Sequence, residues 1–477
     1  MTAQSAVGRI AKKEMLEVFR DGRFRVLSVI ILTLLVTSLA LGWKRYTEVN
    51  QQHEMARKTT RQNWLTQGVK NPHSAAHYGV YAFKPRNVLS FVDQGVDPFT
   101  GVAVWLEAHK QDDFKYRPIQ DANALARFGD LTAAAVLQVL APLLIVLLSF
   151  SAFAGEREQG TLRQLLAIGL PREQIAAGKA LGLAGALGLV LIPAALVGAS
   201  MLILMGEPGT FSSTAGRLLV STLSYTLYFA AFLGICLAVS ARAKSTRTAL
   251  VVLLAFWIAN CLVAPRALTD IARRIYPTPS SYEFAAKVAH DLEYGLNGDS
   301  STSKRAKELQ SSVLRQYGVK DVDELPVSFR GITLQAGEDH GDQVFDKRYA
   351  EVWDAFDRQS ALQQIAGIAA PMLAVRSVSM GLAGTDFAQH RDFAVAAENY
   401  RRQFIKAIND DITKNGTGDG VYLRGEDLWR SIPEFHYVAP DLKWVLSRQL
   451  APLGILVFWA LAGALAAFWS ARHIEAI

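Results

Sequence analysis

The distribution of hydrophobic residues along the chain predicts six membrane-spanning helices. A helix needs about 20 predominantly apolar residues to cross a bilayer. Six runs approach or exceed that length, and they cover residues 26–43, 131–153, 180–205, 216–240, 247–265 and 447–470. Polar residues precede the first run and no small-residue cleavage pattern follows it, which favours a retained span over a signal peptide. The expected fold class is an all-α polytopic membrane protein.

Two long polar stretches, 44–130 and 266–446, separate these spans. The first has a loop-rich centre with short strand-like and helical fragments. The second shows helical patterns at about 281–294, 303–317, 345–366 and 386–414. Because both stretches leave the membrane on the same side, we expect them to form one mainly helical domain built from two insertions.

A further stretch, 366–384, is nearly long enough to span. It contains Pro371 and Arg376, and an arginine at the centre of a span costs about 2.5–3.5 kcal/mol on insertion scales. A seventh span would also place Arg472 outside. We therefore interpret the stretch as a buried or interface-lying hairpin.

The distribution of lysine and arginine predicts which loops face the cytoplasm. Basic residues gather in 1–25, 154–179 and 241–246, whereas the short loop 206–215 has none. This bias predicts that both termini lie in the cytoplasm and that the two long stretches, 44–130 and 266–446, lie on the other side of the membrane. Residues 1–25 are expected to form an amphipathic elbow helix, and 471–477 a short tail.

Composition agrees with this interpretation. Of 477 residues, 51% are hydrophobic and only 19% are charged. The net charge of +7 lies largely in the predicted cytoplasmic loops, where topology and anionic lipid explain it, so no nucleic-acid partner is expected. Cys236 and Cys261 both fall within spans. The large domain is therefore expected to fold without disulfides.

The loop at 154–180 is charged, and glycine and proline mark the boundaries of its predicted helices. Acidic Glu156 and Glu158 begin a helix, where the helix dipole favours them. Gly169 ends this helix, and Pro171 suits the first turn of the next, which runs into the third span. Because both its ends enter the membrane, we expect the loop to be rigid and to transmit a push.

The residues of this loop resemble the signature of ABC-2 type transporter permeases, G-E-[RK]-E-x-G-T-L followed by a Leu-Leu, small, Pro, Arg and distal Gly-Lys pattern. The match comprises Gly155, Glu156, Arg157, Glu158, Gly160, Thr161, Leu162, Leu165, Leu166, Pro171, Arg172, Gly178 and Lys179. The resemblance implies that the segment around 156–168 includes a coupling helix seated in a cleft of a separate ATPase subunit. The implied coupling residues are Glu156, Arg157, Glu158, Gly160, Thr161, Leu162 and Arg163.

The stretch 128–156 is also similar to the subgroup that includes the permease of nitrous-oxide-reductase maturation. The large split domain resembles that of a permease subfamily with such insertions. The chain has no G-x-x-x-x-G-K-[ST] motif, so we expect it not to be an enzyme. ATP and Mg²⁺ would be used by a partner ATPase, with no cofactor bound directly. The resemblance also implies two permease copies, identical or related, in a bacterial inner membrane, with the large domain in the periplasm.

His73 and His77 have the i, i+4 spacing of two metal ligands on one helical turn. With His109, or with Asp386 and His390, they would form an external metal site. Against this, Pro72 makes the stretch a helix start at best, and two spaced histidines are common by chance. We expect a structural or interface role and no bound metal, which also disfavours a membrane metallohydrolase.

Polar residues within the spans mark a second candidate site. Gln138 and Pro142 lie in the second span and Asn260 in the fifth. A polar group within a span faces a protein partner or a cavity. Lining a conduit and bonding between helices both remain open for Gln138 and Pro142, while a structural role is favoured for Asn260.

The sequence thus predicts a permease subunit that couples ATP hydrolysis by a partner to substrate export or to movement of its external domain. An extracytoplasmic partner protein is an open alternative. The rival hypothesis is a membrane receptor or adaptor whose external domain binds a ligand and signals inward. The short stretch after 470 disfavours it, because signalling would require an output domain or a long helix.

Overall fold

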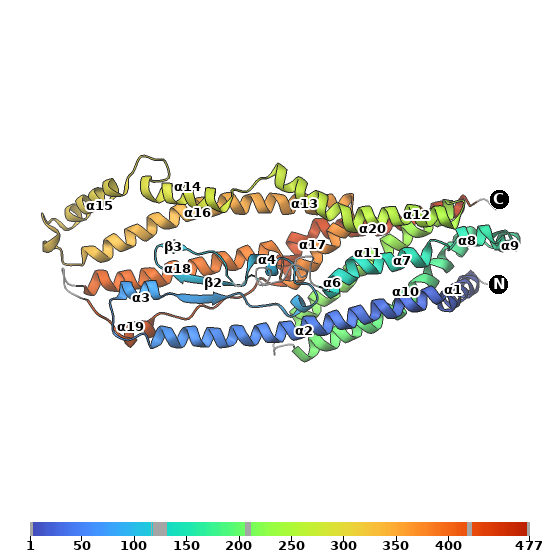
Figure 1. Cartoon of the computed structure of the whole chain (residues 1–477), viewed down its shortest axis with the longest axis horizontal. Coiled ribbons are helices and arrows are strands. Elements are labelled where there is room, and N and C mark those ends of the chain that lie inside the picture. Colours follow the sequence, from blue (N-terminus) through green and yellow to red (C-terminus); the bar gives the residue numbers. More distant parts are fainter. Residues whose placement is uncertain (1–2, 116, 118–130, 206–210, 417–421, 475–477) are drawn as a thin grey trace.

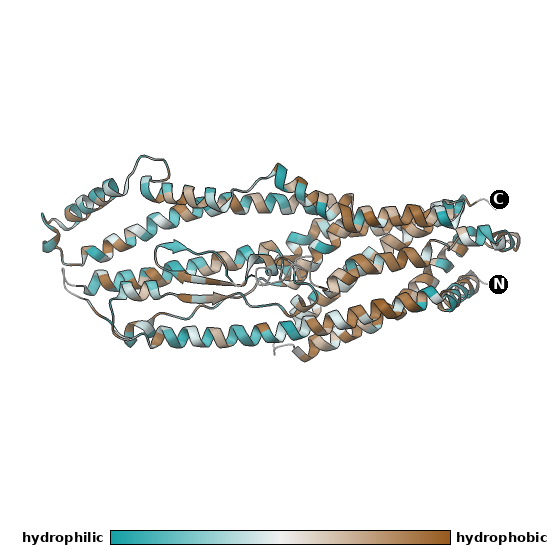
Figure 2. Ribbon diagram, viewed as in Figure 1, coloured by the Kyte–Doolittle hydropathy of each residue, from teal (hydrophilic) through white to brown (hydrophobic). Residues whose placement is uncertain are grey.

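The computed structural model describes residues 3–115, 117, 131–205, 211–416 and 422–474 of an elongated molecule (Figure 1). Both termini lie at one end, which we call the terminal face (Figure 1). Hydrophobic helices fill the half of the molecule next to this face, and polar elements fill the other half (Figure 2). We call the first half the membrane bundle. The second is the distal domain, made of the described parts of 44–117, 276–365 and 386–441.

The described residues contain six helices long and apolar enough to cross a membrane. This confirms the predicted all-α polytopic fold class. Four are continuous: α2 (Gly22–Leu65), α10 (Arg172–Met205), α11 (Phe211–Arg242) and α20 (Leu442–Arg472). Two are composite: α6 (Ala133–Ala135), η3 (Val136–Leu140) and α7 (Ala141–Ser149), and then α12 (Thr246–Trp257), η4 (Ile258–Val263) and α13 (Ala264–Ile275).

The amphipathic helix predicted for 1–25 is α1 (Ala3–Arg20), which ends before Asp21 caps α2. It packs closely on α10 because Gly178 and Gly182 leave room for its backbone. A Cβ atom on Gly178 would lie 2.6 Å from Ile10 Cβ, and one on Gly182 would lie 2.6 Å from the Ala11 carbonyl oxygen. Small residues four apart bring two helices together in this way.

Pro142 follows a short π-helical segment, η3, in the second span. Proline has no N–H to donate to the carbonyl four residues earlier, which here belongs to Gln138. The Tyr228 hydroxyl donates to that oxygen instead, at 2.9 Å. The Trp257 indole similarly donates to the Val139 carbonyl at 2.9 Å. Side chains of neighbouring spans thus satisfy backbone groups where the regular helix is interrupted.

Helix α2 continues far beyond the predicted exit at Trp43. Its 44 residues correspond to a rod of about 66 Å. The polar half consists largely of residues with good helix propensity, such as Lys44 and Glu48, and these two pair across one turn at 3.8 Å. At the far end Trp64 is buried in the distal core and donates to the Trp429 carbonyl at 2.8 Å.

The distal domain contains a small antiparallel sheet in the order β1-β2-β3. Its strands are β1 (Val80–Phe83), β2 (Ala103–Glu107) and β3 (Lys110–Gln111). Val80 pairs with Leu106 and Glu107 with Lys110. The apolar core joins the sheet to α18 (Phe387–Asn415), through buried residues that include Trp64, Val104, Phe393, Phe404 and Trp429.

Helices form the rest of this domain. The short ones are α3 (Pro72–Tyr78), η1 (Val88–Phe91), α4 (Asp97–Thr100), η5 (Val322–Glu324) and α19 (Glu426–Ser431). The long ones are α14 (Ser281–Tyr294), α15 (Thr302–Tyr317), α16 (Phe329–Ile365) and α18 (Phe387–Asn415). They lie within a residue or two of the predicted helices, except that α16 begins well before residue 345.

The stretch 366–384 is largely buried, which agrees with one of the two expected placements, but it does not form the expected hairpin. It forms η6 (Ala366–Ile368) and then one helix, α17 (Pro371–Ala383), which packs against α11 and α20. Pro371 occupies the first helical position and Gly384 closes the helix with a φ of 76°. Arg376 is exposed while most of α17 is buried, so its charge is not forced into an apolar core.

Candidate functional site

The segment at 154–171 forms two short helices on the terminal face, α8 (Ala154–Glu158) and α9 (Thr161–Ala167) (Figure 1). Gly160 adopts a φ of 74° and Gly169 a φ of 80°. Glycine reaches these left-handed values without the penalty of a side chain. The helix expected to run unbroken to Gly169 is therefore divided at Gly160, and the next one begins at Arg172.

Glu156 is buried inside a cluster of two lysines and two glutamates. Its Oε1 lies 2.8 Å from Lys13 Nζ and 2.9 Å from Lys179 Nζ, and Lys179 also binds Glu14. The Lys179 side chain is only 1% exposed. Burial raises the pKa of Glu14, and the neighbouring Lys179 opposes that shift. These contacts tie α8 to α1 and α10, so Glu156 is unavailable for direct contact with a partner.

Arg157 and Glu158 tie α8 to the turn between α11 and α12. The Arg157 guanidinium donates to the carbonyls of Ala241, at 2.7 Å, and Ala243. The Glu158 carboxylate accepts from the backbone N–H of Thr246 at 3.0 Å and from its hydroxyl at 2.9 Å. A displacement of α8 therefore acts on four helices: α1, α10, α11 and α12.

The surface available to a partner lies mainly on α9. We call Arg163, Gln164, Ala167 and Ile168 the α9 face, because all four are exposed. Ile168 is 73% exposed, whereas Leu162 is buried and the Thr161 hydroxyl donates to the Glu156 carbonyl at 3.3 Å. Sequence reasoning missed Ile168. The signal available in the sequence was an apolar residue directly before Gly169 that does not belong to the apolar set Leu162, Leu165 and Leu166.

The candidate conduit residues take part in contacts between helices. Gln138 Nε2 donates to the Tyr225 hydroxyl at 3.1 Å, and that hydroxyl lies 3.0 Å from Ser379 Oγ. Ser379 in turn donates to buried Asp93 at 2.5 Å. Asn260 Oδ1 accepts from the Met372 backbone at 3.2 Å and so caps α17.

The membrane bundle has a cavity of about 560 Å³ between α2, α10 and α11. Its walls are mostly apolar, and the polar exceptions are Asp93, Ser221, Thr222, Tyr225, Thr226 and Ser379. Among the described residues, its lining does not include Gln138, Pro142 or Asn260. An apolar chain suits these walls, and the polar groups would contact a polar end of such a molecule.

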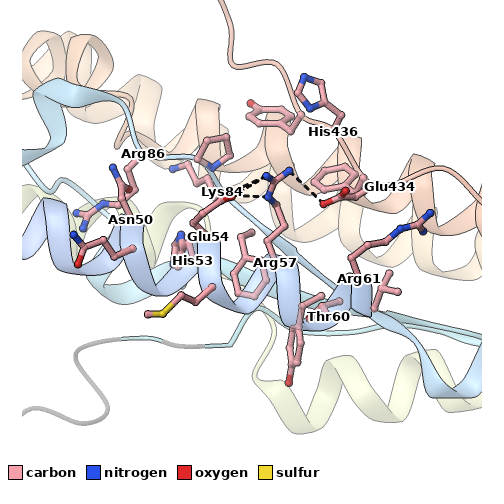
Figure 3. Close-up of a pocket in the computed structure, with 18 of the residues that line it drawn as sticks. Asn50, His53, Glu54, Arg57, Thr60, Arg61, Lys84, Arg86, Glu434 and His436 are labelled. Atoms are coloured by element: carbon pink, nitrogen blue, oxygen red, sulfur yellow. Dashed lines mark hydrogen bonds and ion pairs between the residues drawn. The ribbon is translucent and has the colours of Figure 1, made fainter. Parts of the chain in front are cut away.

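A second cavity, of about 900 Å³, lies in the distal domain (Figure 3). One wall is α2, and the others are β1 with the turn after it and the segment 434–437. Arg57 pairs with Glu54 of the same helix at 3.1 Å and with Glu434 of the 434–437 segment at 3.2 Å (Figure 3). Lys84 at its edge forms a buried pair with Asp97 at 2.6 Å. We call this space the polar cavity because six charged side chains line it, those of Glu54, Arg57, Arg61, Lys84, Arg86 and Glu434.

The structure brings His73 and His77 together with His109. Asn71 caps α3 and so sets the short helix that carries the first two rings. His77 Nε2 and His109 Nε2 lie 3.2 and 3.4 Å from His73 Nε2. The other candidate ligands lie elsewhere: Asp386 caps α18 at the Gln389 N–H, and His390 packs against Phe114. Burial lowers the pKa of His390 to about 3.

Comparison with known protein families identifies the membrane part. The model of the family described as ABC-2 family transporter protein matches residues 9–292, which is more than half of the chain. The chain belongs to the ABC-2 family of transporter proteins. In this ABC-2 protein the match covers most of α1, together with α8, α9 and the first five spans. The family assignment and the geometry of the terminal face therefore concern the same elements.

The distal domain matches a second model. Residues 281–438 match a family described as a domain of unknown function, DUF3526. This range runs from α14 to the segment that forms one wall of the polar cavity. A search of curated proteins finds no match. The family assignment makes this ABC-2 protein a multi-pass membrane component of a transporter.

Proposed function

We propose that this chain is the permease subunit of an ABC transporter and is driven by ATP hydrolysis in a separate ATPase subunit. The observation that carries the proposal is the attachment of α8. Glu156, Arg157 and Glu158 bind α1, α10 and the 241–246 turn, while the neighbouring α9 face is exposed. A partner that moved α9 would therefore move several spans together.

In this proposal the terminal face lies in the cytoplasm of a bacterium and the distal domain in the periplasm. The basic residues at 1–25, 154–179 and 241–246 support that orientation. The ATPase binds the ATP and Mg²⁺, and the permease binds no nucleotide. Two permease copies, identical or related, pair with two ATPase subunits. The resemblance to the nitrous-oxide-reductase maturation subgroup is part of the same proposal.

The output of the ATPase cycle is export of a substrate or movement of the distal domain. Helix α2 supports the second variant, because one continuous helix joins the region beside α1 to the core around Trp64. The apolar cavity in the bundle supports the first variant, because it provides space for an apolar molecule within the membrane.

The test uses the tagged chain purified from native membranes in mild detergent, with bound ATPase identified by mass spectrometry and assayed. Ile168→Asp places a charge on the α9 face without disturbing the core. The matched control is Val438→Asp, at a 77% exposed position in the distal domain. A carboxylate placed in an apolar contact costs about 1–3 kcal/mol or more to desolvate, so ATPase binding should weaken about tenfold or more in the first variant alone.

Two results would contradict the proposal. One is that no ATPase copurifies with the chain. The other is that Ile168→Asp and Val438→Asp retain equal amounts of it. Either result, together with ligand-dependent changes in the distal domain, would favour the receptor alternative.

A further inference from the structure

Three histidine rings from two separate segments converge at one place in the distal domain. His73 and His77 lie on α3, and His109 lies in the turn between β2 and β3. Each ring offers one nitrogen, and the three nitrogens all lie within 4.8 Å of one another. The ring centroids are 4.7, 5.0 and 5.1 Å apart.

The spacing of these nitrogens matches tetrahedral metal ligation. A tetrahedral ion bound at about 2.0–2.1 Å holds its nitrogen ligands about 3.3–3.4 Å apart. The two measured Nε2 separations from His73 are 3.2 and 3.4 Å. A single ion can therefore reach all three rings after small rotations of the side chains.

The outer contacts of His109 are those of a metal-bound histidine. Its Nδ1 lies 2.8 Å from Glu338 Oε1, which leaves Nε2 directed at the other two rings. A histidine ligand usually donates its second ring N–H to a carboxylate in this way, which fixes the tautomer and orientation of the ring. Glu338 is itself held by Arg401 at 3.0 Å, inside the domain core.

The backbone of His109 gives a second, independent observation. It is the one non-glycine residue with a positive φ in the described parts of the chain, at 69°. Glycine or asparagine is usual at such a turn position. The same Glu338 oxygen that accepts from the ring also accepts from the His109 backbone N–H at 2.8 Å. Backbone strain maintained by surrounding contacts often marks a functional position.

We propose that His73, His77 and His109 form a binding site for a divalent transition metal of the zinc class. Three imidazoles suit zinc, copper or nickel, whereas calcium and magnesium prefer oxygen ligands. His77 and His109 are exposed, so the fourth position of a tetrahedral ion faces solvent. Three protein ligands with an open fourth position can accept water or a group from another molecule.

The ion connects parts of the chain that are far apart in sequence. It links α3 to the β2–β3 hairpin directly, and through Glu338 it links both to α16 and to Arg401 of α18. The nearby positive charge of Arg330 opposes a cation, and the negative charge of Glu338 offsets it. The site lies apart from α8 and α9, so the proposal does not depend on a partner ATPase.

The experiment uses the full-length chain in detergent with a streptavidin-binding tag, because a polyhistidine tag would bind metal itself. After chelation and dialysis, ZnCl₂ is titrated by calorimetry and Co²⁺ is followed by its visible absorption. The test variant is His77→Ala, which removes an exposed ligand from the last turn of α3. The control is His436→Ala, at an exposed histidine of the same domain.

The expected result is one Zn²⁺ per chain and the absorption of tetrahedral Co²⁺. Removing a residue that hydrogen-bonds a metal ligand lowers metal affinity about 10–100-fold. Removing the ligand itself should therefore lower the affinity for Zn²⁺ by more than about 100-fold. His436→Ala should bind as the unmodified chain does. The proposal is overturned if Zn²⁺ does not bind, if the two variants bind it equally, or if Co²⁺ gives an octahedral spectrum. Unchanged thermal unfolding of metal-free His77→Ala would show that lost binding is not lost folding.

Discussion

The cluster of Glu14, Lys179, Lys13 and Glu156, in which only Lys13 is exposed, gives a quantitative test of how α1 is held. Its two lysines and two glutamates carry no net charge when all are ionised. Lys179→Met removes one cation and leaves Glu14, whose side chain is 8% exposed, with only Lys13 to compensate it. Glu14→Gln removes one anion, while Lys179 keeps Glu156 at 2.9 Å.

The expected losses follow from these contacts. Removing one partner of a buried ion pair costs about 3–5 kcal/mol. We expect about 3 kcal/mol for Lys179→Met and about 1–2 kcal/mol for Glu14→Gln, because Lys179 retains a second partner. The double variant restores neutrality and should lose only about 1–2 kcal/mol. The coupling energy between the two sites is then about 3 kcal/mol, within the upper range for interacting residues.

The measurement is the apparent Tm of the four proteins in one detergent at one heating rate. With about 2 °C per kcal/mol for a large chain, Lys179→Met should lower Tm by about 6 °C and the double variant by about 2–4 °C. Losses that simply add in the double variant would refute the reasoning, because two independent sites have no coupling energy.

Three further outcomes are expected. Gly182→Val places Cβ against the Ala11 carbonyl and should cost about 1–3 kcal/mol; the control Gly188→Val meets only the Ile192 side chain at 3.4 Å and should unfold at the unmodified Tm. Trp64→Ala should lose about 3–5 kcal/mol and expose the distal domain, but not the bundle, to proteolysis; equal cleavage of both would contradict this. His390 has its pKa lowered by burial to about 3 in the folded protein, so the unfolded chain takes up the proton first and stability falls as pH drops below about 6.5. His390→Phe should remove about 2 kcal/mol of that loss between pH 6.5 and 5 in unfolding measurements, and parallel pH profiles would contradict the assignment.

The parts of the fold that were predicted correctly depend on local signals. Apolar runs long enough to span, the glycine at 169 and the proline at 171 each act within a few residues of themselves. The helices predicted at about 281–294 and 386–414 were found as α14 and α18, and their caps, Ser280 and Asp386, bond within the first turn of each helix.

The remainder depended on contacts that the sequence pattern does not reveal. Glu156 is part of a resemblance to a coupling segment, yet its partner Lys13 lies 143 residues away in the chain, and only the fold brings them together. His109 reaches His73 because a two-residue turn at the end of β2 directs it there. The polar half of α2 was missed because the prediction relied on hydropathy. Hydropathy identifies segments apolar enough to cross a membrane, but it does not show whether the helix continues through polar residues.

Helix α2 can act as a lever with its fulcrum at Gly42. A Cβ atom there would lie 2.2 Å from the Phe91 carbonyl oxygen, so the rod and η1 touch backbone to backbone. From Gly42 to Leu65 the helix extends about 35 Å, and a tilt of about 10° would therefore shift its far end by about 6 Å. That arm is one wall of the polar cavity in the distal domain. A small rotation within the membrane would thus change the width of a binding space outside it.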